Sequence, residues 1–195
     1  MLAKSHLSLG LIGGILAFGV AREIDISKEF YFGIMLPFIL LGSVFPDIDE
    51  PKSYIGRKLP LISHIVSISF SHRGFTHFIA FPLIFLIFGI FLINVNFNIA
   101  LILFAFSYGI LLHQIGDMLT ISGIPHYFFP FSKARAVLLP KVLRFRTGST
   151  KEMLLLTIAF IPLIAFLATN FGVSEFDMNI DIKNILNLLG ELSSK

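Results

Sequence analysis

The sequence contains no cysteine and little charge. Without cysteine, disulfide bridges and thiolate metal sites are excluded, so any metal ion would have to bind histidine and carboxylate side chains. Only 14% of the 195 residues are Asp, Glu, Lys or Arg, whereas 55% are hydrophobic. With 23 Phe and a mean hydropathy of +0.87, this composition does not suit a soluble surface. The chain is therefore expected to fold in lipid.

Long runs without charged residues predict an all-α membrane protein, a single domain over residues 1–195 with about five helical spans. About 20 apolar residues cross the hydrocarbon core, and the expected spans are 6–21, 30–46, 75–94, 99–117 and 153–174. An Asn-rich turn at 94–98 separates the middle two as a hairpin. The first run is short, and a cleaved signal peptide is its alternative interpretation. Apolar residues at helical spacing also predict an amphipathic helix over 181–192.

The basic residues predict the orientation of these spans. Eleven of the 15 Lys and Arg residues lie before the first span or in the two long segments 47–73 and 118–152. By the positive-inside rule, the N-terminus and both segments are cytoplasmic, and five spans then place the C-terminus outside. The net charge of +3 is small, and it orients the protein rather than indicating a nucleic-acid partner.

Seven potential metal ligands fall at one end of four of these spans. They are His6, Asp47, Asp49, His72, His77, His113 and Asp117. In the predicted topology all seven lie at one depth on the cytoplasmic side. Ionisable side chains at a membrane edge are costly to desolvate unless they are paired or coordinated, so their convergence indicates a functional site. The sequence therefore predicts a divalent metal site with histidine and carboxylate ligands.

Local spacing supports this site and leaves structural alternatives open. His113 and Asp117 lie one helical turn apart on one face, where they either share an ion or form a helix-stabilising hydrogen bond. Asp47 and Asp49 follow Pro46 directly after a span, where they either bind a cation or solvate the helix end.

The polar residues near these ligands also have both a functional and a structural interpretation. Arg73 either binds a phosphate or carboxylate group or anchors the chain at the cytoplasmic surface. Arg146 is a second candidate for contact with a substrate. Ser149 and Glu152 are predicted to form a capping box at the start of the fifth span. The remaining histidines are expected in loops at the membrane interface: His64 and His126.

The motifs occur along the chain, from the N-terminus to about residue 155, in a specific order: Ser5-His6, Gly42 to Asp49, His72 to His77, His113 to Thr120 with Gly123 and Pro130-Phe131, and Phe145 to Ser149 with Glu152. This ordered set resembles the YdjM-like family of membrane-bound, metal-dependent hydrolases, some of which are described as LexA-regulated inner-membrane proteins. The resemblance implies a helical inner-membrane protein with a hydrolase label and ligands at the positions named above. After residue 155 it is limited to an apolar span.

Residues and resemblance together predict metal-assisted hydrolysis. Zn²⁺ is the first choice for one or two ions because histidine ligation suits it, with Mn, Fe or Mg as alternatives. The ion would lower the pKa of bound water to about 7. Asp49 would act as general base, and Arg73 and Arg146 would stabilise negative charge on the substrate. A site at the lipid–water boundary beside basic loops favours an amphiphilic, anionic substrate such as a phospholipid or another phosphoester.

Two other classes of function stay open. His113 and Asp117 have the His-x-x-x-Asp spacing of the phosphatidic acid phosphatase type 2 superfamily. This resemblance implies a metal-free lipid phosphatase with a His nucleophile. The Ser-Arg and Pro-Ser-Gly-His elements of that superfamily are missing here. The second class is a non-enzymatic metal-binding or metal-transport membrane protein. A transporter is expected to carry its ligands near the bilayer midplane, not at one edge.

Overall fold

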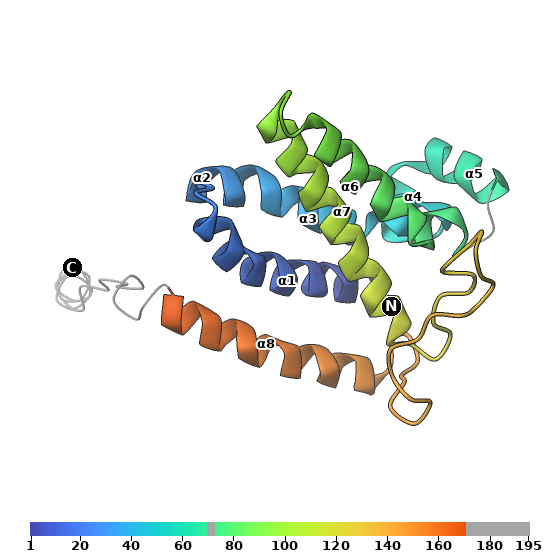
Figure 1. The fold of residues 1–195 in the computed structure, drawn as a ribbon. Coiled ribbons are helices and arrows are strands. Elements are labelled where there is room, and N and C mark those ends of the chain that lie inside the picture. Colours follow the sequence, from blue (N-terminus) through green and yellow to red (C-terminus); the bar gives the residue numbers. More distant parts are fainter. Residues whose placement is uncertain (70–72, 171–195) are drawn as a thin grey trace, which may run out of the picture. The chain divides into compact units, whose positions relative to one another are not determined.

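The computed structural model describes residues 1–69 and 73–170, and this part of the chain is built from helices and turns (Figure 1). Two isolated β-bridges occur within it, and the described residues contain no strand. The all-α prediction is therefore confirmed for these residues. The chain divides into two compact units, Met1–Phe160 and Ile161–Lys195. The helix predicted at 181–192 lies outside the described residues.

Three helices among the described residues are long and apolar enough to cross a membrane. They are α1 (Ala3–Glu23), α7 (Phe97–Met118) and the Thr150–Leu167 part of α8 (Thr150–Asn170). They match the predicted spans at 6–21 and 99–117 and the described part of the span at 153–174. These segments confirm membrane-type helices, whereas the predicted count of about five is not confirmed.

The other two predicted spans are shorter in the structure because the chain leaves the helix near the site. The run predicted at 30–46 consists of α2 (Lys28–Phe30), a π-helical turn (Tyr31–Met35) and α3 (Leu36–Gly42), followed by the 3-10 turn Phe45–Asp49. The run predicted at 75–94 begins with the 3-10 turn Phe75–His77, and α6 extends only from Ala80 to Leu92. At 13 residues α6 is about 20 Å long, less than the roughly 30 Å hydrocarbon core.

The segment predicted as a cytoplasmic loop between the second and third spans is partly helical, and the loop prediction is wrong there. It contains α4 (Tyr54–Lys58) and α5 (Pro60–Ser69). Ser53 caps α4, since its hydroxyl oxygen accepts a hydrogen bond from the Gly56 N–H at 2.9 Å. His64 is exposed, as predicted, but it lies on α5. His126 is exposed in a turn beside the buried Tyr127.

The hairpin predicted around 94–98 is present and supplies the central helix. Helix α6 ends at Leu92, and Asn96 caps α7 by accepting the Ile99 N–H at 3.1 Å. Helix α7 then packs against α1, α3 and α6 (Figure 1). Its C-terminal end lies beside the N-terminus of the chain in the same view. The residues at that end of α7 therefore meet the first turn of α1.

The crossing of α3 and α7 depends on two glycines. A Cβ atom on Gly109 would collide with the Ile39 carbonyl oxygen, and one on Gly42 would collide with the Phe106 carbonyl oxygen. The two backbones approach this closely only because neither residue has a side chain. Ser43 follows Gly42 directly, and His113 lies one turn after Gly109. The crossing therefore brings a main-chain carbonyl to a predicted ligand.

Candidate metal site

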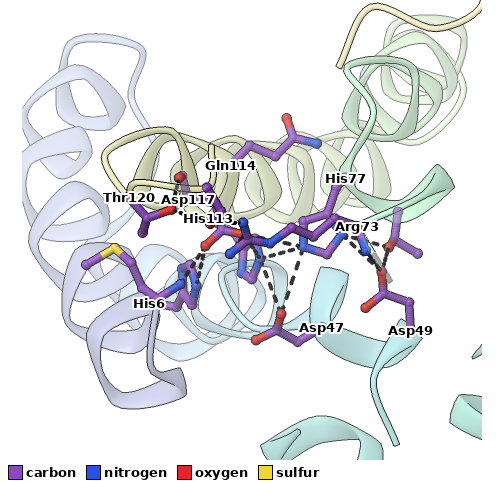
Figure 2. Close-up of polar contacts among 12 residues, drawn as sticks. His6, Asp47, Asp49, Arg73, His77, His113, Gln114, Asp117 and Thr120 are labelled. Carbon is purple, nitrogen blue, oxygen red and sulfur yellow. Dashed lines mark hydrogen bonds and ion pairs between the residues drawn. The ribbon is translucent and has the colours of Figure 1, made fainter. Parts of the chain in front are cut away.

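Five predicted ligands from separate parts of the sequence meet at the C-terminal end of α7 (Figure 2). The first turn of α1, the 3-10 turn after α3, the 3-10 turn before α6, and α7 itself supply them: His6, Asp47, His77, His113 and Asp117. The side chains of the histidines and of Asp117 are at most 1% exposed. The Asp47 side chain is 18% exposed, so solvent reaches the cluster from its side.

Three atoms of this cluster lie close enough to hold one metal ion, and an oxygen of Asp117 lies near two of them. The Nε2 atoms of His77 and His113 are 3.2 Å apart. Asp47 Oδ1 lies 3.9 and 3.7 Å from these two nitrogens, and Asp117 Oδ2 lies 3.6 and 3.9 Å from them. Ligand atoms about 2.0–2.1 Å from a tetrahedral Zn²⁺ are about 3.3–3.5 Å from one another. Asp47, His77 and His113 could thus hold a metal ion with small adjustments.

Hydrogen bonds at the far side of each ring fix the direction of its Nε2 lone pair. The His113 Nδ1 lies 2.8 Å from the Ser43 carbonyl oxygen, which can only accept, so Nδ1 carries the proton. The His77 Nδ1 lies 3.2 Å from Asp49 Oδ2. With both Nδ1 atoms donating, two Nε2 lone pairs point at each other over 3.2 Å. Such an arrangement is stabilised by a proton on one Nε2 or by a metal ion between them, as in histidine metal sites with an outer acceptor.

His6 contributes to a second group that shares His113. Its ring stacks on that of His113 with centroids 3.7 Å apart, and its Nε2 lies 3.5 Å from Asp117 Oδ1. Neither ring nitrogen of His6 has a hydrogen-bond partner among the described residues. Buried ring nitrogens without a protein partner are uncommon, and they are available to bind a metal ion or a water. His6, His113 and Asp117 could also hold a metal ion. The Met1 ammonium lies 2.5 Å from Asp117 Oδ1.

Asp49 lies behind His77 and not among the ligand atoms. Its Oδ2 accepts hydrogen bonds from the Arg73 backbone N–H at 2.8 Å and from the Thr76 hydroxyl at 3.2 Å, and it faces His77 Nδ1. Its side chain is fully buried. These contacts suit a carboxylate that orients a histidine ligand.

Arg73 links the cluster to the loop after α7. One guanidinium nitrogen, Nη2, lies 3.3 Å from Asp117 Oδ2. The other, Nη1, donates to the Ser122 hydroxyl and, at 2.7 Å, to the Gly123 carbonyl oxygen. The backbone of Arg73 is in the left-handed region, with a φ of 61°, which lets its N–H face Asp49 while its side chain reaches Asp117. Arg146 lines a pocket beside Arg73, and His72 lies outside the described residues.

The sequence matches the YdjM inner membrane protein family over residues 1–175, a range that includes every site residue described above. This chain belongs to that family. The resemblance seen in the motifs is therefore confirmed, and family membership together with the apolar helices supports a membrane location.

Three named relatives are similar to this YdjM-family chain over most of its length. It is 34% identical over 161 residues to the uncharacterized protein YvsG of Bacillus subtilis (strain 168), a match covering 80% of this chain and 88% of YvsG. It is 32% identical over 128 residues to the inner membrane protein YdjM of Escherichia coli (strain K12), covering 64% of either protein. The same figures hold for YdjM of Shigella flexneri. No solved structure matches the chain significantly.

Several polar residues that support the site were not predicted from the sequence. Gln114 is fully buried, donates to the Phe78 carbonyl oxygen at 3.1 Å and accepts from the Tyr127 hydroxyl at 3.1 Å. Burial raises the pKa of Tyr127 to about 12, so its hydroxyl remains a donor throughout the physiological range. A glutamine within a charge-free apolar run, directly after His113, was a signal for this role. Ser43 contacts His113 through its main-chain carbonyl oxygen, and a main-chain contact cannot be recognised from the residue type.

The capping box predicted from Ser149 and Glu152 is half present. The Glu152 N–H donates to the Ser149 hydroxyl at 3.4 Å, as expected at the start of α8. The Glu152 carboxylate, however, accepts from the backbone N–H groups of Gly148 at 2.6 Å and Leu2 at 3.0 Å. It thus ties the start of α8 to the residue that precedes α1, close to the candidate metal site.

Proposed function

We propose that this YdjM-family chain is a membrane-bound, metal-dependent hydrolase that acts on a phosphoester or another amphiphilic substrate at the cytoplasmic membrane surface. One observation carries the proposal. The imidazole Nε2 atoms of His77 and His113 face each other at 3.2 Å, each ring is held by an acceptor at Nδ1, and two carboxylates face the gap. This is the donor set of a hydrolytic metal centre.

Zn²⁺ suits this donor set best. Zn²⁺ binds imidazole nitrogen and carboxylate oxygen together in four-coordinate sites, whereas Mg²⁺ prefers six oxygen ligands and waters. Mn and Fe are the nearest alternatives. When bound, such an ion lowers the pKa of coordinated water toward 7 and supplies hydroxide near neutral pH. A second ion would need His6 and Asp117 Oδ1.

The side chains around the centre would divide the remaining work. Asp47 is the partly exposed member and also lines a pocket that opens toward Tyr54 and Arg57, so substrate would approach from its side. Asp49 would orient His77. Its burial behind that ring favours this role over the general-base role expected from the sequence. Arg73 would hold Asp117 in place through their ion pair.

The same geometry disfavours a metal-free phosphatase in which His113 is the nucleophile. Attack on phosphorus needs an open path to Nε2, but the His113 side chain is fully buried, with His77 Nε2 3.2 Å away and the His6 ring stacked against it. Its other nitrogen is engaged by Ser43. The ring is therefore better placed as a ligand.

The purified protein in detergent should release phosphate from phosphatidic acid or from p-nitrophenyl phosphate. A chelator should abolish the release, and added Zn²⁺ should restore it. Asp47→Asn should lower the rate by more than about 100-fold, because it replaces an anionic ligand of the ion by a neutral amide and does not only change an outer contact. Asp25→Asn, at an exposed carboxylate at the far end of α1, is the matched control. Bound metal without hydrolysis of any ester or amide would indicate a non-enzymatic metal protein.

The proposed orientation places the N-terminus and the site loops in the cytoplasm and the C-terminus outside. It is supported by the basic residues that surround the site. Because the chain lacks cysteine, single cysteines report the topology directly. In intact cells, Val142→Cys should resist a membrane-impermeant maleimide and Val95→Cys should react. Both side chains are highly exposed, at 84% and 77%. The reverse labelling pattern would show that the site loops lie outside, opposite to the proposed orientation.

A further inference from the structure

A second polar pocket lies beside the candidate metal site, with Arg73 on the wall between them. It has a volume of about 480 Å³, and three arginines contribute to its lining: Arg73, Arg135 and Arg146. Thr120, Ser122 and Thr147 also line it, and the Thr120 hydroxyl donates to the Asp117 carbonyl oxygen at 2.7 Å. Guanidinium groups combined with hydroxyl donors form a set that recognises tetrahedral oxyanions.

Main-chain pairing holds two of these arginines on opposite sides of one segment. Residues 120–124, which follow α7, pair with Phe145 on one side, where the Ile121 N–H donates to the Phe145 carbonyl oxygen at 3.0 Å. On the other side Ile124 exchanges two hydrogen bonds with Ala136, at 3.0 and 2.9 Å. Phe145, Ile124 and Ala136 are buried and anchor both pairings. Arg146 and Arg135 are the neighbours of these anchors in the chain, which explains why both border the pocket.

The charges of the pocket are not balanced by its own lining. Arg73 is offset by its ion pair with Asp117. Arg135 and Arg146 have no ion pair among the described residues, and no carboxylate contributes to the pocket lining. Two positive charges that have no ion pair in the described part of the chain, beside Ser122 and Thr147, match the two negative charges of a phosphate monoester near neutral pH.

We propose that this pocket binds a terminal phosphate group of the substrate between Arg135 and Arg146. Arg73 contacts both the pocket and Asp117, so a phosphate held here lies next to the metal cluster. The role of the pocket in catalysis rests on the proposed hydrolase function, whereas its binding of phosphate does not require a metal. A lipid headgroup and a soluble phosphomonoester share the recognised chemistry.

The test is the equilibrium binding of radiolabelled inorganic phosphate to the full chain in detergent, both metal-loaded and chelator-treated. Arg135→Gln and Arg146→Gln should each raise the Kd about tenfold in both states, because each removes a charge-assisted contact. Lys133→Gln and Lys141→Gln, exposed basic residues of the same loop that do not line the pocket, are matched controls and should change the Kd less than twofold. Thermal unfolding verifies that each variant is folded.

Competition then separates the two sources of the phosphate group. Displacement by vesicles of phosphatidylcholine with phosphatidic acid, but not by glycerol 3-phosphate, supports a lipid headgroup, and the reverse supports a soluble ester. Wild-type protein without measurable phosphate binding would overturn the proposal, as would equal weakening in the lysine controls. Phosphate binding that requires the metal and has the same Kd in Arg135→Gln and Arg146→Gln as in the wild type would overturn it, while leaving the hydrolase proposal intact. Phosphate binding by a protein that never takes up metal would instead reject only the hydrolase.

Discussion

His77→Ala and His113→Ala should each lose the bound metal that the wild-type protein carries. Elemental analysis of protein purified in detergent, without an affinity tag, should find about one Zn²⁺ per chain in the wild type and close to none in either variant. Each substitution deletes one of the two Nε2 ligands that face each other at 3.2 Å. His64→Ala removes an exposed histidine on α5 and should retain the metal.

The number of ions and their retention distinguish the outcomes. Two ions per wild-type chain would show that His6 and Asp117 form a second site, and His6→Ala should then lose one of them. Wild-type protein that stays metal-free after incubation with Zn²⁺, Mn²⁺ and Fe²⁺ would contradict the proposal of a metal-dependent hydrolase. The metal-free phosphatase would then be the preferred function. Vanadate inhibition would then be the next measurement.

A partial loss of metal affinity is expected when Asp49, which contacts the ligand His77, is changed. Asp49→Asn should weaken metal binding by about 10- to 100-fold without abolishing it, because the amide still fills the space behind His77 but no longer accepts its Nδ1 proton as well. Asp25→Asn should leave the affinity unchanged. If the Asp49→Asn protein contained as little metal as His113→Ala, Asp49 would itself be a ligand.

Charge patterning was enough to predict the helical membrane character and the proximity of the candidate ligands. Spans such as α7 are long and carry no charged residue before Asp117 near their end, and ligands at the ends of spans come together when the helices pack side by side. The 3-10 turns at Phe45–Asp49 and Phe75–His77 were not predicted, because the apolar runs 30–46 and 75–94 that border or include them fit continuous helices. The chain leaves the helix there and aims Asp47 and His77 at α7.

Contacts made by the main chain explain most of what the sequence did not predict. The acceptor for His113 is a carbonyl oxygen, and any residue at position 43 would provide one. Asp49 has the same chemistry as Asp47, and only their placement in the turn makes one face the cluster and the other lie behind His77. Arg135 is one of many basic residues in its loop and becomes distinctive only through the pairing of Ala136 with Ile124.

Gly109→Ala should destabilise the protein and weaken its metal site together. Alanine favours helices over glycine by up to about 1 kcal/mol, so on propensity alone the change would stabilise α7. At this position the new methyl group meets the Ile39 carbonyl oxygen, which is backbone and has little freedom to yield. Overpacking of this kind costs about 1–3 kcal/mol and should outweigh the gain. We therefore expect a lower Tm in detergent.

The matched control is Gly33→Ala, because nothing lies within 4 Å of a Cβ atom at Gly33 and the residue is also helical. It should leave the Tm unchanged or raise it slightly. The metal content shows whether the crossing serves the site. Separation of α3 from α7 moves the Ser43 carbonyl away from His113 Nδ1, now 2.8 Å apart, and should weaken metal binding about 10- to 100-fold. A Gly109→Ala protein with wild-type affinity would show that His113 is oriented without Ser43, and that the close crossing serves packing alone.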